Sequence, residues 1–162
     1  LPCYPIQFLS VSWRGWKLGN TPCCLGRNSL WLPHRKIEIT IAGERVRFQT
    51  THLAHENDAF AAHQAEEMVA WIDSGGNADV PVVILSDFNS RPDNDAMSQY
   101  ENAEFVCVRD SDEQILDEID HIMYRPRDRW RLLKAGKPTH YTASDHDPMW
   151  ALLELLSPPP TP

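Results

Sequence analysis

An apolar run at residues 82–85 constrains the fold of this chain more than any other stretch. A run this apolar is typical of a strand that is buried inside a sheet. Because side chains alternate between the two faces of an extended chain, Asp87 and Asn89, which follow the run, lie on the same side. The amide can donate to a phosphate oxygen, while the carboxylate can accept a proton or bind a divalent cation. Taken alone, the same pair is equally typical of a turn that Asp and Asn cap.

Residues 37–49 form a predicted β-hairpin that leads to a histidine. Isoleucines alternate with polar residues before an Ala-Gly-Glu turn, and Val46 and Phe48 alternate with polar residues after it. Continuing the second strand puts His52 on the face of Val46 and Phe48, at the strand end. His52 is therefore either a structural histidine or part of a site at the same edge as Asp87.

The other predicted elements alternate between helices and strands. One helix, capped by Asn57 or Asp58, is expected to run to about Asp73, and a short one, capped by Asp93 or Asn94, is expected to run to Tyr100. Further strands are expected at residues 105–108, 119–124 and 149–155. This alternation predicts a layered α/β or α+β fold.

The 162 residues suffice for one domain, which we place between two irregular ends. We expect an irregular, unassigned N-terminal segment at 1–35, the domain at 36–156 and a proline-rich tail at 157–162. The net charge of −8 argues against tight, indiscriminate binding of nucleic acid. The four cysteines have no metal-ligand spacing, and no apolar run is long enough to span a membrane.

Charged residues form two unusual runs late in the chain. Arginines stand at every second position at Arg125, Arg127, Arg129 and Arg131. If this stretch is extended, the four guanidinium groups share one face and form either a strip that contacts substrate phosphates or a solvated strand edge. The acidic run at residues 110–118 is expected to be a solvated loop rather than a cation site.

Four short segments each place polar side chains at the end of a predicted strand. They are Thr-His-Leu at 51–53, Ser-Asp-Phe-Asn at 86–89, Ile-Asp-His-Ile at 119–122 and Ser-Asp-His-Asp-Pro at 144–148. In this order they resemble the C-terminal half of the endonuclease/exonuclease/phosphatase family, which includes deoxyribonuclease I, apurinic endonucleases, sphingomyelinases and inositol polyphosphate phosphatases. The resemblance covers residues 36–155 and implies a two-sheet β-sandwich flanked by helices, of the deoxyribonuclease I-like kind.

The resemblance also implies a role for each polar residue at these strand ends. His146 would be the general base, Asp120 would orient it, and Asp87 would position or activate the attacking water. Asn89 would bind the phosphoryl oxygens, and His52 would stabilise their charge. This arrangement suits in-line displacement at phosphorus, because a carboxylate fixes the tautomer and orientation of the histidine that it contacts.

Metal ligands are implied in the same way. Asp145, Asp87 and Asn89 would bind the metal ion, and oxygen ligands favour Mg²⁺ or Mn²⁺ over zinc. Separately from the resemblance, the spacing of Arg125, Arg127 and Arg129 predicts that they contact a polyanionic substrate if this stretch is extended.

The sequence departs from the family at two places. Ser86 stands where the family usually has glycine, a change that a side chain pointing into the sheet can accommodate. Family members also begin with a strand that bears an asparagine and a segment that bears a metal-binding glutamate, and residues 1–35 match neither. We therefore expect an incomplete domain that lacks the N-terminal half, has little activity alone, and depends on a missing segment or a partner to complete the sandwich.

The function predicted first is a metal-dependent phosphoesterase that hydrolyses a phosphodiester or phosphomonoester by in-line attack of water. Its substrate would be a phosphate ester such as a nucleic acid, a phospholipid or a phosphoinositide. A non-catalytic binding module that keeps the fold without the metal is the alternative. A third interpretation is a dinuclear metallohydrolase site that would use His52, His55, His63, Asp87 and His146. The spacings of these residues argue against it, because they match no usual zinc arrangement.

Overall fold

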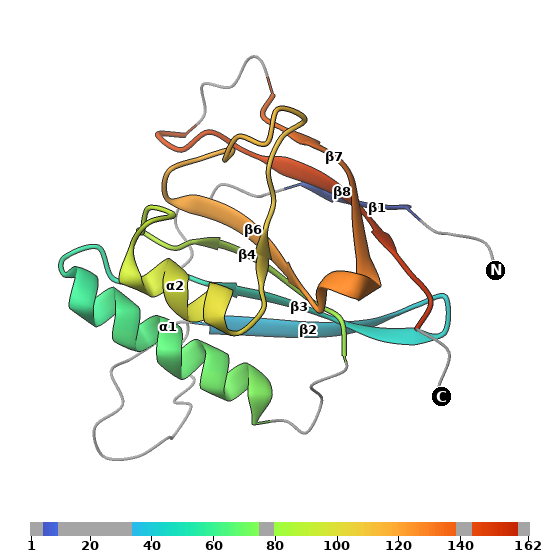
Figure 1. The fold of residues 1–162 in the computed structure, drawn as a ribbon, viewed down its shortest axis with the longest axis horizontal. Coiled ribbons are helices and arrows are strands. Elements are labelled where there is room, and N and C mark those ends of the chain that lie inside the picture. The colour runs from blue at the N-terminus through green and yellow to red at the C-terminus, as the bar shows by residue number, and fades with distance from the viewer. Residues whose placement is uncertain (1–4, 10–33, 75–79, 139–143, 159–162) are drawn as a thin grey trace.

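The computed structural model describes residues 5–9, 34–74, 80–138 and 144–158 of the chain. The five-stranded sheet has the order β2-β3-β4-β6-β5, and the three-stranded sheet has the order β1-β8-β7. Two helices cover one face of the larger sheet and the smaller sheet covers its other face (Figure 1). In chain order the elements are β1 (Pro5–Leu9), β2 (His34–Ile41), β3 (Glu44–Thr51), α1 (Asp58–Asp73), β4 (Val82–Asp87), α2 (Asp95–Asn102), β5 (Val106–Cys107), β6 (Asp120–Arg125), the 3-10 helix η1 (Arg127–Arg129), β7 (Trp130–Gly136) and β8 (Trp150–Leu155).

Strand β4 is the predicted buried strand, and it contributes side chains to two separate cores. Val82 and Ile84 pack with the helices, whereas Val83 packs in the core between the two sheets. The strand runs parallel to β3, to which α1 connects it, and antiparallel to β6. Both faces of β4 are covered, which explains why its sequence is apolar without alternation.

The two helices begin where the capping residues predict. Asn57 caps α1 by accepting a hydrogen bond from the backbone N–H of Phe60, and Asn94 caps α2 by accepting one from Ala96. The buried stripe of α1 repeats at helical spacing and packs on the sheet; it consists of Ala61, Gln64, Ala65, Met68 and Ile72. The two predicted helices are therefore confirmed. In the described part of the chain, neither of them is long and apolar enough to cross a bilayer.

The predicted hairpin is also confirmed, but its two strands differ in burial. Ile37 pairs with Phe48 and Ile39 pairs with Val46, so all four side chains lie on the face toward the smaller sheet. Phe48 and Val46 are 7% and 0% exposed, whereas Ile37 and Ile39 are 61% and 42% exposed. Among the described residues, none of the buried members of the inter-sheet core lies on β2, and only its last residue, Ile41, packs against that core, so most of the edge strand extends beyond the cover of the smaller sheet.

Two expectations about secondary structure are wrong. Residues 1–35 are not irregular throughout, because β1 forms at Pro5–Leu9 and pairs antiparallel with β8. The arginine run is not extended, because Arg125 ends β6 and Arg127–Arg129 is a 3-10 helix. Tryptophans 13, 16 and 31 lie outside the described residues.

Candidate active site

Pairing between strands brings the predicted site residues to one edge of the larger sheet. Asp87, the last residue of β4, pairs with Asp120, the first residue of β6. His52, which follows β3, forms an isolated parallel bridge with Asp87. Three strand ends therefore meet where the sequence predicted three polar side chains.

Asp120 and His146 form the shortest contact between two ionisable side chains of the site. Nδ1 of His146 lies 2.9 Å from Oδ2 of Asp120, and the two side chains are 34% and 19% exposed. An ionised carboxylate only accepts hydrogen bonds, so Nδ1 carries the hydrogen and the neutral ring presents Nε2 as an acceptor. The loop before β8 supports this position, because Ser144 Oγ accepts a hydrogen bond of 3.2 Å from the backbone N–H of His146.

The Asp87 carboxylate makes one contact with each of its oxygens. Oδ1 accepts a hydrogen bond of 2.9 Å from the backbone N–H of Asn89, and Oδ2 lies 3.3 Å from Nε2 of His52. The Asp87 side chain is 18% exposed, whereas that of His52 is 61% exposed. Asp87 is therefore held on the protein side, while His52 remains accessible from solvent.

Asn89 holds two of the strand ends together. Its backbone has a φ of +45°, in the left-handed region that asparagine tolerates better than most residues. This conformation accompanies a hydrogen bond of 2.8 Å from Nδ2 of Asn89 to the carbonyl oxygen of Leu53. Leu53 in turn donates its backbone N–H to the carbonyl oxygen of Asp87 at 3.3 Å.

The electrostatics of the site favour a cation or a proton. Burial raises the pKa of Asp120, and the nearby Asp87 charge adds to this effect, while the hydrogen bond from His146 opposes it. The hydrogen bond to Asp120 is the main reason why the pKa of His146 is raised above its ordinary value. Two carboxylates thus lie close together in one small region, and their negative charge stabilises the protonated form of the histidine beside them.

One group among the described residues has the spacing of a metal site. Oxygen or nitrogen atoms of Asp87, Asp120 and His146 lie within 4.8 Å of one another. Asp145 does not belong to this group, and its exposed carboxylate accepts a hydrogen bond of 3.3 Å from Ser144 Oγ. Two carboxylates suit Mg²⁺ or Mn²⁺, because Mg²⁺ is often bound by one or two carboxylates together with water and substrate phosphates.

The structure does not bring the arginines to this edge. Arg125 lies at the other end of β6 from Asp120, about 17 Å away at the usual rise of a strand. Its guanidinium group pairs with Asp73, and the buried Arg129 pairs with Glu44. Arg127 is exposed in the 3-10 helix.

His55 and His63 also lie apart from the three-residue group. Nδ1 of His55 lies 3.8 Å from Glu56, and Nδ1 of His63 lies 3.4 Å from Glu66. Both histidines are exposed, and both of these contacts are local in sequence. The structure therefore gives no support to the dinuclear histidine site.

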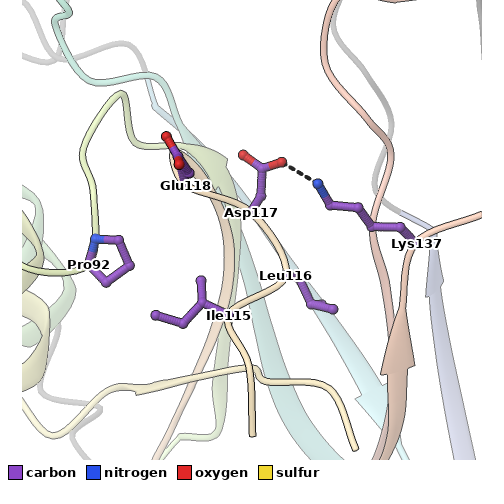
Figure 2. A pocket seen from close by; sticks show the side chains of 6 residues that line it. All are labelled: Pro92, Ile115, Leu116, Asp117, Glu118 and Lys137. Atoms are coloured by element: carbon purple, nitrogen blue, oxygen red, sulfur yellow. Dashed lines mark hydrogen bonds and ion pairs between the residues drawn. The ribbon is translucent and has the colours of Figure 1, made fainter. Parts of the chain in front are cut away.

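The structure adds an ion-pair cluster that the sequence did not indicate. Lys137 Nζ lies 2.6 Å from Oδ2 of Asp117 and 3.6 Å from Oδ2 of Asp147. Figure 2 shows the first pair at the rim of a hollow of about 320 Å³ lined by Pro92, Ile115, Leu116, Asp117, Glu118 and Lys137. Asp117 belongs to the acidic run, and the sequence holds no pattern that pairs it with a lysine 20 residues later.

Comparisons with known proteins identify the fold. No family model matches the chain, and no curated protein matches it either. Among solved structures, the catalytic domain of human Nocturnin with a bound sulfate anion superposes with a TM-score of 0.65 at 16% identity, over 76% of this chain and 52% of that one. The chain has the endonuclease/exonuclease/phosphatase fold.

Two further structures have this fold. An endonuclease/exonuclease/phosphatase from Bacteroides vulgatus matches with a TM-score of 0.63 at 17% identity, over 94% of this chain and 65% of that chain. The β-toxin of Staphylococcus aureus with bound magnesium matches with a TM-score of 0.56 at 17% identity, over 74% and 57% of the two chains. This chain spans about half the length of the Nocturnin catalytic domain described above. The predicted α+β sandwich of the deoxyribonuclease I-like kind is confirmed.

Ser86 fits the sheet as expected. Its side chain is buried, and its Oγ accepts a hydrogen bond of 2.8 Å from the backbone N–H of Thr51. The hydroxyl therefore has a donor inside the sheet, and this contact links β3 to β4 one residue before Asp87.

Proposed function

We propose that this chain carries the site of a divalent-cation-dependent phosphoesterase that hydrolyses a phosphate ester by in-line attack of water. The observation that supports the proposal most is the hydrogen bond between Asp120 and His146 beside the Asp87 carboxylate. A histidine whose second nitrogen is held by a carboxylate is oriented to remove a proton from water. The fold, shared with endonuclease/exonuclease/phosphatase structures, supports the same class of reaction.

In the proposed reaction His146 is the general base. Its Nε2 takes the proton of the attacking water, and Asp120 keeps Nδ1 protonated and stabilises the imidazolium that forms. Asp87 accepts a hydrogen bond from the same water and directs its lone pair toward phosphorus. The raised pKa of His146 shows that the protein stabilises its protonated form, which favours this proton transfer.

Asn89 and His52 bind the phosphoryl group. His52 is exposed and adjacent to Asp87, so a phosphoryl oxygen at the site mouth lies within reach of its ring N–H when it is protonated. Asn89 reaches the same mouth from the turn after β4, with Nδ2 held by Leu53. Both residues would reduce the negative charge that repels the attacking water.

A divalent cation would be held by Asp87 with Asn89 and Asp145, and Asp120 offers a further carboxylate. When bound, Mg²⁺ or Mn²⁺ would neutralise charge on the phosphoryl oxygens. The magnesium in the S. aureus β-toxin structure and the sulfate in the Nocturnin structure support a cation and a tetrahedral anion at such a fold. A role of Arg125, Arg127 and Arg129 in substrate binding is a weaker proposal, because Arg125 and Arg129 are engaged in ion pairs.

A non-catalytic phosphate-binding module is the second candidate. One observation favours it: the predicted metal ligand Asp145 lies outside the three-residue group, and its carboxylate accepts a hydrogen bond from Ser144 Oγ. Such a module would bind phosphate through His52 and Asn89 without turnover.

The test is hydrolysis of two generic substrates, bis-p-nitrophenyl phosphate and p-nitrophenyl phosphate, with Mg²⁺ and with Mn²⁺. We expect little turnover from this chain alone, and we expect chelator to abolish what there is and Asp87→Asn and His146→Ala each to reduce it by at least about 10²-fold. His63→Ala is the matched control, because His63 is an exposed histidine outside the three-residue group. Turnover in either site variant at the wild-type rate would refute the catalytic assignment, and phosphate binding without turnover would favour the second candidate.

A further inference from the structure

Two loops carry the Asp120–His146 pair, and one lysine contacts both. Lys137 directly follows β7, and its ammonium lies 2.6 Å from Oδ2 of Asp117 and 3.6 Å from Oδ2 of Asp147. Asp117 stands three residues before Asp120, and Asp147 directly follows His146. The lysine thus joins the segment before β6 to the segment before β8.

Asp117 transmits this contact to the backbone of Asp120. Its Oδ1 accepts hydrogen bonds of 3.1 Å from the backbone N–H of Ile119 and 3.3 Å from that of Asp120. Partial burial favours the protonated acid, but the hydrogen bonds from Lys137 and from these two amides outweigh it and lower the pKa of Asp117. Asp117 is therefore ionised near neutral pH and uses both oxygens.

The ammonium also separates two like charges. The Asp117 and Asp147 carboxylates both lie within 3.6 Å of Nζ, so without this cation they would face each other across a short gap. Lys137 and Asp117 are 29% and 19% exposed, which makes their pair less screened than one on the open surface. Removing the charge of Lys137 would push the two loops apart.

We propose that Lys137 is a positioning residue that holds His146 against Asp120. The contacts form a closed ring. Asp117 bonds to the backbone of Asp120 and to Lys137, and Lys137 also contacts Asp147, which follows His146 in the chain. The hydrogen bond of 2.9 Å between His146 and Asp120 closes the ring. The effect of Lys137 on catalysis rests on the proposed function. Its effect on the geometry of His146 does not.

Direct contact of Lys137 with substrate is the competing role. The ammonium lies at the edge of the hollow in Figure 2, where a ligand has access to it. A residue that binds substrate changes KM when its charge is removed, whereas a residue that holds the catalytic pair changes kcat. The two roles therefore separate in steady-state kinetics.

The kinetic test compares Lys137→Met, Lys137→Arg and the control Lys134→Met in the full chain. Lys134 is an exposed lysine of β7, three residues before Lys137, and its amine lies over the Trp150 ring. We expect Lys137→Met to lower kcat about tenfold with KM unchanged, and the arginine variant to recover most of the loss. Unchanged kcat, or a raised KM with unchanged kcat, overturns the proposal.

A second measurement does not need activity. The imidazole ¹⁵N and ¹H resonances of His146, assigned by their loss in His146→Ala, report whether Nδ1–H is held by Asp120. We expect a protected Nδ1–H resonance in the wild type, in Lys137→Arg and in Lys134→Met, and its loss in Lys137→Met. Asp147→Asn, at a residue 66% exposed, weakens the same ring without threatening the fold, and we expect partial loss there.

Together, the kinetic and the NMR measurements show whether the phosphoesterase proposal or the positioning role of Lys137 has failed. An inactive wild type in which Lys137→Met still loses the Nδ1–H resonance refutes the phosphoesterase and supports the positioning role. An active wild type in which Lys137→Met keeps both its rate and its resonance supports the phosphoesterase and refutes the positioning role.

Discussion

Asp120 acts on His146 in two ways, as a hydrogen-bond acceptor and as a negative charge. The acceptor keeps the hydrogen on Nδ1, and the charge raises the pKa of the ring. An amide in the same position can also present an N–H to Nδ1, which places the ring hydrogen on the wrong nitrogen. Replacing the carboxylate by its amide therefore removes both effects with little change in volume.

We predict that Asp120→Asn lowers kcat by about 10³-fold and moves the acid limb of kcat/KM to lower pH. A general base works only in its neutral form, so activity is lost as the pH falls through the pKa of the base. A raised pKa therefore places this loss at a higher pH. Removing the Asp120 charge lowers the pKa of His146, so the remaining activity persists to lower pH. Rates measured across the neutral range test this, with the exposed Asp128→Asn as the control. An acid limb that stays in place would show that another group sets it.

The backbone of Asn89 gives a prediction that separates stability from activity. Glycine and alanine both lose the hydrogen bond from Nδ2 to Leu53, but at a φ of +45° glycine is unstrained, whereas alanine adds steric strain. We expect Asn89→Gly to be more stable than Asn89→Ala by about 1 kcal/mol in urea unfolding, with both variants losing activity. Equal stability of the two variants would contradict the left-handed conformation.

At the scale of elements, the hairpin of β2 and β3 shows that the hydrophobic pattern does not by itself determine burial. Ile37 and Phe48 are cross-strand partners on one face, yet only Phe48 lies under the smaller sheet. Phe48 also pairs with Val83 of β4, whereas Ile37 lies on the edge strand, so the difference in burial comes from the second neighbouring strand as well as from the second sheet.

We predict that Phe48→Ala lowers the free energy of unfolding by about 3 kcal/mol, whereas Ile37→Ala lowers it by about 0.5 kcal/mol. The first substitution leaves a cavity between the two sheets, and the second removes a side chain that is 61% exposed. Urea unfolding of both variants measures the difference. A large loss in Ile37→Ala would indicate that this face of β2 is covered in solution.

The N-terminal cap of α1 also contributes to stability at the scale of elements. Asn57 accepts the backbone N–H of Phe60 at 3.1 Å, and the helix packs on the face of the sheet opposite the smaller sheet. We expect Asn57→Ala to destabilise the chain by about 1 kcal/mol, and Asn57→Ser to restore most of it, in thermal unfolding. An alanine variant as stable as the wild type would show that packing alone determines where the helix begins.

For the whole molecule, the site is a meeting point of three strand ends and one loop, so the proposed binding of a cation would depend on the folded state. A ligand that binds only the folded chain stabilises it, by about 1.4 kcal/mol at ten times its Kd. We predict that Mg²⁺ or Mn²⁺ at this level raises the Tm by about 3 °C. Asp87→Asn should abolish the increase, while Asp112→Asn, in the exposed part of the acidic run, should keep it. The same shift in both variants would place the cation elsewhere.

Sequence reasoning predicted the elements whose residues carry their own pattern. The buried strand β4 is one continuous apolar run, and α1 begins at a capping asparagine and carries a stripe at helical spacing. These properties depend on neighbours within a few residues. The four polar segments were recognisable for the same reason, since each is a short stretch at the end of a strand.

Contacts between distant segments were decided by the tertiary structure. Strand β1 pairs with β8, about 145 residues later, and the sequence of β1 contains nothing that specifies this partner. The alternation of arginines predicted a strip, but Arg125 and Arg129 bind acids on other elements, Asp73 and Glu44. A charge has many possible partners of opposite sign in a chain, and only the fold determines which one comes within reach.

The candidate site divides in the same way. The sequence by itself indicated Asp87, Asn89, Asp120 and His146, because each lies in a short segment with a recognisable order. The distance of 2.9 Å between Asp120 and His146, and the lysine that bridges Asp117 and Asp147, exist only in the folded chain. Strand register and loop packing place these atoms to a fraction of an ångström, and that placement depends on the whole sheet rather than on any one stretch of sequence.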